Sequence, residues 1–333
     1  MNGLEQLPVG AALTRWIRDA RPSLPRDFNP FQPHGVLAEQ EPDAAGVLQS
    51  ALVVFLVNRE CPWTCLECDL WKFTTKTRLP AGAIPRQIQS AFRSMQSSAR
   101  PSWLKLYNSG SFFDPGAIPV DDHAAIAVMA SEFERLVVEC HPSLIGDRCW
   151  RFRDRLSSRL EVAMGLESVH PAALSRLNKR MTPEDFARAA AQLRRHDVDV
   201  RAFLLIQPPG MPGVDVVDWT VQGAVFAAQA GAGVVSLIPT RSGNGALDRL
   251  QTARQFASPS LRVVEQAFER SLAAVATRAR VFLDTWDWSR LARCGVCAQA
   301  RLERVEAMNR IQRLLPRIDC ACDIAEESRA DTT

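Results

Sequence analysis

The chain has 333 residues, of which 47% are hydrophobic, so it is long enough to bury one large core. The formal net charge is only +3, which permits RNA binding without indicating it. The sequence shows no apolar run long enough for a membrane span and no secretory or transit signal, so we expect a cytoplasmic protein with no membrane partner.

Residues 1–50 are rich in Pro and acidic residues and show weak periodicity, which predicts an N-terminal extension. Beyond it, short apolar runs rich in β-branched residues are typical of buried strands. These runs span residues 51–57, 104–108, 135–140, 161–166, 200–206 and 233–239. Helical spacing lies between them, most clearly after Thr182, where Pro183 supplies a first-turn proline and Asp185 an acid three residues after the cap.

The alternation of strand and helix predicts an α/β fold, a partial (β/α)6 barrel of the TIM type over residues 51–258. From about Pro259 a long helix leads to the strand-like run VFLD. Residues 259–333 are therefore expected to form a C-terminal segment that carries cysteines.

The first strand runs directly into Cys61, Cys65 and Cys68. In a chain without an export signal, clustered cysteines indicate metal binding or catalysis before disulfides. The C-terminal end of a strand is also where barrel active sites form. Three thiolates can hold three irons of a 4Fe-4S cluster and leave the fourth iron open to a ligand that is not protein. The alternative is a zinc site with a distant fourth ligand.

Polar residues follow the later strands. After the second strand come Asn108, Ser109, Gly110 and Ser111, which could bind a ligand or form a simple turn. The third and fourth strands end at Glu139 and Glu167, and Asn178, Lys179 and Arg180 follow. A buried carboxylate is costly without a partner, so an ion pair of Glu167 with Lys179 or Arg180 is an alternative to ligand binding.

The fifth and sixth strands bring Gln207, Arg241 and Asn244 toward the barrel mouth. Residues 243–245 could form a backbone nest for an anion beside Arg241, or only a tight turn. Further along, the acidic and aromatic residues of LDTWDW could line the mouth and stack a flat substrate, although core packing explains the tryptophans as well. These residues are Asp284, Trp286, Asp287 and Trp288.

Four more cysteines, Cys294, Cys297, Cys320 and Cys322, form two pairs on either side of a predicted helix that includes residues 302–311. This second set could hold zinc or an auxiliary iron–sulfur cluster, or remain reduced thiols, and the thiolate count does not separate the two metals. Cys140 and Cys149 are expected to be small core residues.

The segments CPWTCLECDLWK, LYNSGSFFD, GLES, LNKRMTPEDF and SLIPTRSGNGALDRL resemble the elongator-like branch of the radical S-adenosylmethionine (SAM) superfamily. Within it they look most like the radical SAM partner of archaeosine synthase and its uncharacterised bacterial relatives. The resemblance covers roughly residues 50–325. It implies a 4Fe-4S cluster on the first three cysteines, with S-adenosyl-L-methionine at the open iron and a 5′-deoxyadenosyl radical that abstracts hydrogen from the substrate.

The resemblance also implies roles for single residues. Asn108, Ser109, Gly110 and Ser111 would bind the SAM amino group. Glu139 and Glu167 would bind the ribose, and Lys179 the SAM carboxylate. The chain departs from the family at Glu67, where an aromatic residue usually contacts adenine, and Trp63 or Trp71 could replace it.

The implied partners are an electron donor such as flavodoxin or ferredoxin and, more distantly, a tRNA or a partner enzyme. The expected function is therefore radical SAM oxidoreductase or transferase chemistry, with a tRNA nucleobase as one possible substrate. Two alternatives stay open: the same chemistry on a small molecule or peptide, and a non-catalytic zinc or iron–sulfur protein that binds RNA.

Overall fold

The computed structural model describes residues 7–95, 100–211 and 213–322. One sheet dominates it, with the strand order β1-β2-β5-β6-β7-β8-β9-β10. Its strands are β1 (Gly35–Pro42), β2 (Leu48–Leu56), β5 (Trp103–Asn108), β6 (Arg135–Glu139), β7 (Arg159–Glu167), β8 (Asp199–Ile206), β9 (Val234–Pro239) and β10 (Arg280–Leu283). Strand β1 runs antiparallel to β2, and all other neighbours in the sheet are parallel.

The predicted partial barrel is confirmed, because the strands from β2 to β9 are the six that the sequence indicates, in the same order. Two strands extend this core. β10 adds a parallel strand beside β9, and β1 adds an antiparallel strand beside β2 from within the first 50 residues. The short strands β3 (Asn58–Arg59) and β4 (Thr74–Thr75) form a separate two-stranded sheet.

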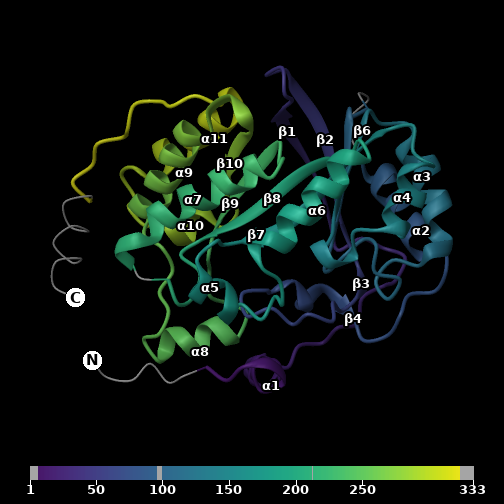
Figure 1. Ribbon diagram of the computed structural model, residues 1–333, viewed down its shortest axis with the longest axis horizontal. Coiled ribbons are helices and arrows are strands. Elements are labelled where there is room, and N and C mark those ends of the chain that lie inside the picture. The colour runs from purple at the N-terminus through teal and green to yellow at the C-terminus, as the bar shows by residue number, and fades with distance from the viewer. Residues whose placement is uncertain (1–6, 96–99, 212, 323–333) are drawn as a thin grey trace.

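Helices cover the outer face of the sheet (Figure 1). They are α2 (Ala83–Ser94), α3 (His123–Ala130), α4 (Asp147–Arg153), α6 (Pro183–Arg195), α7 (Val216–Gln229), α9 (Leu261–Val275) and α11 (Ala298–Ile311). The remaining helices are α1 (Gly10–Ala20), α5 (Pro171–Arg176), α8 (Ala246–Thr252) and α10 (Trp288–Leu291). Single 3-10 turns are η1 (Leu70–Phe73), η2 (Val120–Asp122), η3 (Pro142–Leu144), η4 (Gly213–Asp215) and η5 (Ala276–Arg278).

Helix α6 begins as its sequence predicts. The Thr182 side chain accepts a hydrogen bond from the Asp185 backbone, and the Asp185 carboxylate accepts one from the Thr182 backbone. Such a reciprocal cap satisfies two backbone donors that a helix start leaves open. Phe186 and Leu193 then face the core with no measurable exposure, so the cap and the apolar stripe fix the same helix.

Side chains along the parallel strands alternate between two environments, because successive residues of a strand point to opposite faces. On β7, Leu160, Val162 and Met164 belong to the main hydrophobic cluster under the helices. Glu161, between them, forms ion pairs on the other face, inside the barrel. The outer face therefore carries the hydrophobic core, and the inner face carries polar and charged groups.

A buried ion-pair network fills the inner face near the N-terminal ends of the strands. Glu41 of β1 accepts hydrogen bonds from Lys105 and Arg201, each at 2.6 Å, and lies 3.4 Å from Arg280 of β10. Burial alone would raise the pKa of Glu41, but Arg201 and Lys105 hold that pKa well below its usual range. Because β1 and β10 stand at opposite ends of the strand order, these pairs curl the sheet toward closure.

Within the described ranges, none of the helices has the length and apolar character that crossing a lipid bilayer requires.

Candidate active site

The loop that carries Cys61, Cys65 and Cys68, here called the cysteine loop (residues 60–73), leaves β2 and returns to β4. Its ends are joined by the β3–β4 pair, in which Asn58 lies opposite Thr74 and Arg59 opposite Thr75. Within the loop, the Cys68 N–H donates to the Cys65 carbonyl at 3.4 Å. The strand ends therefore hold three thiols in one short, closed segment.

Two asparagines from distant loops bind the backbone of the cysteine loop. The Asn178 amide, after β7, donates to the Thr64 carbonyl at 2.9 Å. The Asn244 amide, after β9, donates to the Leu66 carbonyl at 2.7 Å. The sequence indicates both asparagines as residues near the barrel mouth but gives no sign of these contacts.

The sequence allows an anion nest or a tight turn at residues 243–245, and in the structure the backbone there binds the carboxylate of Asp248. The backbone N–H groups of Gly243 and Gly245 both donate to one carboxylate oxygen of Asp248, at 3.1 and 2.6 Å. A Cβ on Gly245, which has a φ of +88°, would overlap the Ala20 carbonyl oxygen at the end of α1. This loop thus joins α1, α8 and the cysteine loop, which agrees with the tight turn, one of the two alternatives that the sequence leaves open at residues 243–245.

Arg241 and Gln207 are also engaged within the protein. Arg241 donates to Asp284 at 3.1 Å and to the Trp286 carbonyl. Gln207 donates to the Ala257 carbonyl at 2.9 Å. Neither side chain is aimed at an open anion site.

The segment after β5 lies directly against the cysteine loop. A Cβ built on Gly110 would meet the Cys61 Cβ at 3.2 Å, and the φ of +154° at this position also favours glycine. The Ser109 N–H donates to the Asn58 side chain at 3.1 Å, and the Ser111 hydroxyl accepts from the His141 N–H at 2.9 Å. The predicted turn is therefore fixed on both sides, with its glycine beside the first cysteine.

Asn108 ends β5 and is only 2% exposed, yet neither polar atom of its side chain has a partner among the described residues. A buried amide that lacks partners costs free energy, and such a group marks a place where a ligand could satisfy it. The backbone N–H of Asn108 does have a partner, because it donates to the Glu139 carboxylate at 3.2 Å.

Glu139 and Glu167 end neighbouring strands, as predicted. Burial raises the pKa of Glu139 to about 8, so this carboxyl is largely protonated at neutral pH when nothing else is bound. Glu167 follows a register shift between β7 and β8 and has a φ of +62°. That irregularity redirects the Glu167 side chain at the very end of the strand.

Glu167 and Lys179 form a buried ion pair, which is one of the alternatives left open by the sequence. Burial opposes the charged form of Lys179, but the Glu167 carboxylate raises the pKa of this amine. The pair lies over Gly165, because a Cβ there would overlap Glu167 Oε1 and Lys179 Nζ. The glycine of GLES is therefore required by the contact itself.

Glu67, which replaces the usual aromatic residue, points into the same region. Burial and the neighbouring Glu167 carboxylate raise the pKa of Glu67 to about 8. Its Oε2 atom is buried and has no hydrogen-bond partner within the described part of the chain. Trp71 is also buried, 5% exposed, and the Arg21 guanidinium lies 4.8 Å from the centre of its ring.

Trp63 and His141 connect the cysteine loop to the end of β6. Their rings stack with centroids 4.3 Å apart and an interplanar angle of 19°. The Nε2 atom of His141 also lies 3.0 Å from the Lys179 carbonyl oxygen. Burial lowers the pKa of His141 to about 4, so the ring is neutral. The sequence assigns this histidine no role, because nothing in its spacing indicates a stacking partner 78 residues away.

Burial raises the pKa of each thiol of the triad, with Cys68 reaching about 12. Metal binding requires deprotonated thiols, so a metal must displace these protons. In the part of the chain that is described, the only His, Cys, Asp and Glu group with all ligand atoms within 4.8 Å of one another is a different one, formed by Cys294, Cys297, Cys320 and Cys322.

The aromatic residues of LDTWDW divide between two roles. Trp288 is 7% exposed and donates to the Ala298 carbonyl at 3.0 Å, so the core interpretation is right for this residue. Trp286 is 59% exposed, and its ring lies 6.2 Å from that of Phe55 on the inner face of β2. Cys140 and Cys149 belong to the main hydrophobic cluster, as predicted.

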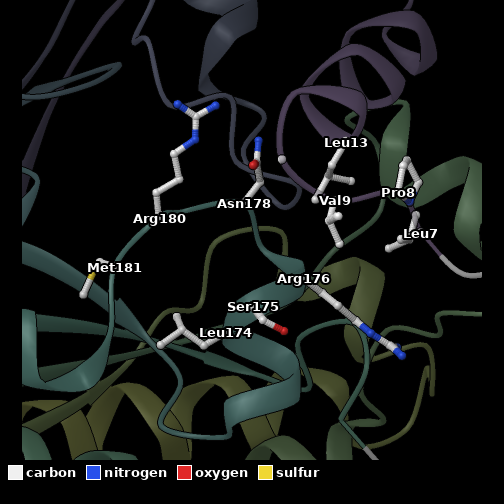
Figure 2. Close-up of a pocket in the computed structure, with 11 residues that line it drawn as sticks. Leu7, Pro8, Val9, Leu13, Leu174, Ser175, Arg176, Asn178, Arg180 and Met181 are labelled. Carbon is white, nitrogen blue, oxygen red and sulfur yellow. The ribbon is translucent and has the colours of Figure 1, made fainter.

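A pocket of about 300 Å³ lies between the segment around α1 and the loop that follows β7. Figure 2 shows Val9 and Leu13 on one side, Leu174 and Met181 on the other, and the guanidinium groups of Arg176 and Arg180 pointing in opposite directions. The floor of this pocket includes Asn178, whose amide binds the cysteine loop. The pocket is thus a neighbour of the site and not part of its inner face.

We compared the chain with known proteins, and no family model matches it. It is 24% identical over 209 residues to an uncharacterized protein of Methanocaldococcus jannaschii, a match that covers 59% of this chain and 57% of the relative. It is 25% identical over 179 residues to archaeosine synthase subunit beta of Thermococcus kodakarensis, covering 50% of this chain and 55% of the relative. The chain spans little more than half the length of these curated relatives.

Similar solved structures include Elp3 of Methanocaldococcus infernus, at 13% identity and a TM-score of 0.46, covering 70% of this chain and 56% of that one. Another is HemN of Escherichia coli, a radical SAM coproporphyrinogen III oxidase, at 12% identity and a TM-score of 0.44, covering 68% and 52%. The predicted resemblance to the archaeosine synthase partner is confirmed as a similarity.

Proposed function

We propose that this protein is a radical SAM enzyme whose 4Fe-4S cluster is bound by Cys61, Cys65 and Cys68. When bound, the cluster and SAM supply reductive cleavage of a carbon–sulfur bond and a 5′-deoxyadenosyl radical for hydrogen abstraction. One observation carries the proposal. The cysteine loop meets the Asn108 amide, which has no partner among the described residues, and a set of buried charged groups at the C-terminal ends of β5, β6 and β7, where barrel enzymes hold their ligands.

The spacing of the thiols favours a cluster over a single zinc ion. Zinc needs four ligand atoms at about 2.0–2.3 Å, which brings them all close together. Within the described residues, the triad belongs to no such compact group, whereas the second set of cysteines does. A cubane cluster spreads its three thiolates over three irons and leaves one iron open, which suits three cysteines with no fourth protein ligand.

We assign the SAM contacts to the residues that meet the cysteine loop. The Asn108 amide, whose side-chain atoms have no partner in the part of the chain that the structure describes, offers a donor and an acceptor, together with the turn through Ser111. Glu139 and Glu167 would accept hydrogen bonds from ribose hydroxyls, and Lys179 would pair with the SAM carboxylate. Because Lys179 is held by Glu167 in the free protein, SAM binding would exchange partners within a preformed cluster of charges.

We propose that residues 1–50 and 259–333 help enclose this site and exclude water. Arg21 and Arg26 of the N-terminal part each form an ion pair with Glu60 at 2.6 Å, directly before Cys61. Asp284, in the C-terminal part, binds Arg241 at 3.1 Å. These contacts support a barrel covered from both sides.

The substrate class is inferred from the relatives. One of them is a subunit of archaeosine synthase, so we propose a tRNA nucleobase as the substrate, together with a partner enzyme and an electron donor such as flavodoxin or ferredoxin. We also propose a cytoplasmic setting, because a reducing compartment keeps the cluster thiols available.

Electron paramagnetic resonance tests the open iron directly. The protein is reconstituted without oxygen, reduced with dithionite, and examined with and without SAM. We expect a reduced-cluster signal that changes when SAM is added, because SAM occupies a coordination position on the cluster. The combined substitution of Cys61, Cys65 and Cys68 by Ala should remove the signal, whereas Cys140→Ala, in the core, should retain it.

The outcome also separates the alternatives. If the resonance signal of the reduced cluster does not change when SAM is added, the site is closed and non-catalytic, and the proposal is overturned. Addition of bulk tRNA, of a peptide mixture or of neither to the SAM-containing sample then distinguishes the substrate classes, since the correct class should increase SAM turnover.

A further inference from the structure

The second cysteine set, Cys294, Cys297, Cys320 and Cys322, has a geometry that its sequence could not reveal. Cys294 Sγ lies 3.8 Å from Cys320 Sγ, and Cys297 Sγ lies 3.6 Å from Cys322 Sγ. All four sulfurs lie within 4.8 Å of one another. They therefore form a compact cage with contributions from two chain segments.

The size of the cage matches one metal ion. With zinc–sulfur bonds of about 2.3 Å, the edge of a regular tetrahedron of sulfurs is about 3.8 Å. In a four-iron cubane each thiolate binds a different iron and points outward, so the sulfurs lie about 6 Å or more apart. The observed distances fit a single ion and are too short for a cubane.

The first cysteine pair is fixed by the start of α11. The Ala298 backbone N–H donates to the Cys294 carbonyl at 3.1 Å, and the Arg301 backbone N–H donates to the Cys297 carbonyl at 2.9 Å. The backbone of the first helical turn thus holds both cysteines of this pair in place.

The second pair is brought back by two arginines on α11. Arg304 donates to the carbonyls of Leu315 and Pro316 at 2.7 and 2.6 Å, and Arg301 donates to the Ile318 carbonyl at 3.3 Å. The arginines are in turn paired with glutamates of α9, at 2.5 Å from Arg301 to Glu265 and 2.6 Å from Arg304 to Glu269. The segment after α11 is thus returned along the helix to the first pair.

We propose that Cys294, Cys297, Cys320 and Cys322 bind one zinc ion in a closed tetrahedral site that fastens the C-terminal segment to α11 and the barrel. Four thiolates leave no coordination position open for a substrate, so the ion is structural. The site is independent of the cluster at the barrel mouth and stands whether or not the proposed function does.

The test uses the full chain with Cys61, Cys65 and Cys68 replaced by Ala, so that any metal reports on the second site alone. The protein is prepared without oxygen, supplied with iron, sulfide and zinc together, desalted, and analysed for metals and acid-labile sulfide. We expect one zinc per chain and no sulfide. X-ray absorption at the zinc edge should give four sulfur ligands at about 2.3 Å.

Cobalt offers a second readout that does not depend on zinc retention. Co²⁺ alone, titrated into the metal-free protein, should give the intense visible bands of a tetrahedral thiolate site and saturate at one equivalent. In the same background, Cys320→Ser with Cys322→Ser should abolish the bands, and Cys140→Ala should preserve them. Removal of the ion should also increase tryptic cleavage near Arg317 about tenfold or more, because the segment is no longer fastened.

Three outcomes would overturn the proposal. Iron with stoichiometric sulfide in the triad-free protein would mean an auxiliary cluster. Disulfides between the pairs, persisting under reductant, would mean a covalent clasp. Fully reduced thiols that take up neither zinc nor cobalt would mean that the cage binds nothing.

Discussion

The glycine of GLES provides a sharp test of the charged cluster at the barrel mouth. A methyl group at Gly165 would overlap Glu167 Oε1 and Lys179 Nζ and would lie 3.0 Å from Glu167 Cδ. The side chains of Glu167 and Lys179 are only 10% and 12% exposed, so neither can move into water without leaving its partner. Gly165→Ala therefore forces either a backbone shift or separation of the ion pair.

These two responses set the expected magnitude. Accommodating an extra methyl by small shifts costs about 1–3 kcal/mol. Breaking a buried ion pair costs about 3–5 kcal/mol. We expect Gly165→Ala to lower the free energy of unfolding by at least about 1 kcal/mol, and to weaken SAM binding because Lys179 moves.

Urea unfolding of the cluster-free chain measures the first effect. Gly233→Ala is the matched control, since a Cβ at Gly233 meets nothing within 4 Å and its change should stay within about 0.5 kcal/mol. Measuring Gly165→Ala in a Glu167→Ala background should reveal coupling of about 0.5 kcal/mol or more. Strictly additive effects, or a Gly165→Ala protein as stable as the control, would refute the packing of the pair over Gly165.

Three further predictions follow from other contacts. Asn244→Ala removes the amide that binds the Leu66 carbonyl at 2.7 Å, so we expect a loss of about 1–3 kcal/mol in urea unfolding and faster loss of iron in air; unchanged iron retention would speak against a bracing role. Glu41→Gln leaves Arg201 short of a buried partner and should lower the free energy of unfolding by about 3–5 kcal/mol; a change below about 1 kcal/mol would show that the network does not need its charge. Glu139 has a pKa raised by burial to about 8, so the unfolded chain releases this proton first and the stability of the cofactor-free protein falls as pH rises from about 4.5 to about 8, by up to about 1.4 kcal/mol per pH unit. Glu139→Gln should remove that share of the slope, and an identical pH profile in both proteins would contradict the assignment.

The barrel strands could be predicted because their signal is local. The run that became β2 contains the continuous apolar stretch ALVVFL, and the run that became β7 is apolar from Val162 to Leu166, as expected for strands buried on both faces. Strand β1 carries Glu39, Glu41 and a proline, which look like surface residues in the sequence. Glu41 is nevertheless buried, because Lys105 and Arg201 supply partners 64 and 160 residues away. No local pattern could show those partners.

The candidate site also combines features that are local in the sequence with contacts between distant residues. The cysteine spacing and the polar strand ends are local signals, and they lead to the edge of the barrel where we propose the site. The contacts that hold the loop, such as Trp63 on His141 and Asn178 on Thr64, depend on which loops the fold brings together. A local signal also separates the two alternatives at residues 243–245. Gly245 and Asp248 have the spacing of a helix cap, which explains why the backbone there binds a carboxylate of the chain itself.

If the protein is a radical SAM enzyme, it cleaves SAM and releases 5′-deoxyadenosine, which can be measured directly. The protein is purified without oxygen, reconstituted with iron and sulfide, and incubated with SAM and dithionite, with and without bulk tRNA, before analysis by mass spectrometry. We expect 5′-deoxyadenosine from the intact chain and none when Cys61, Cys65 and Cys68 are replaced by Ala. A fully reconstituted chain that yields none in either condition, or equal amounts from both proteins, would contradict this expectation.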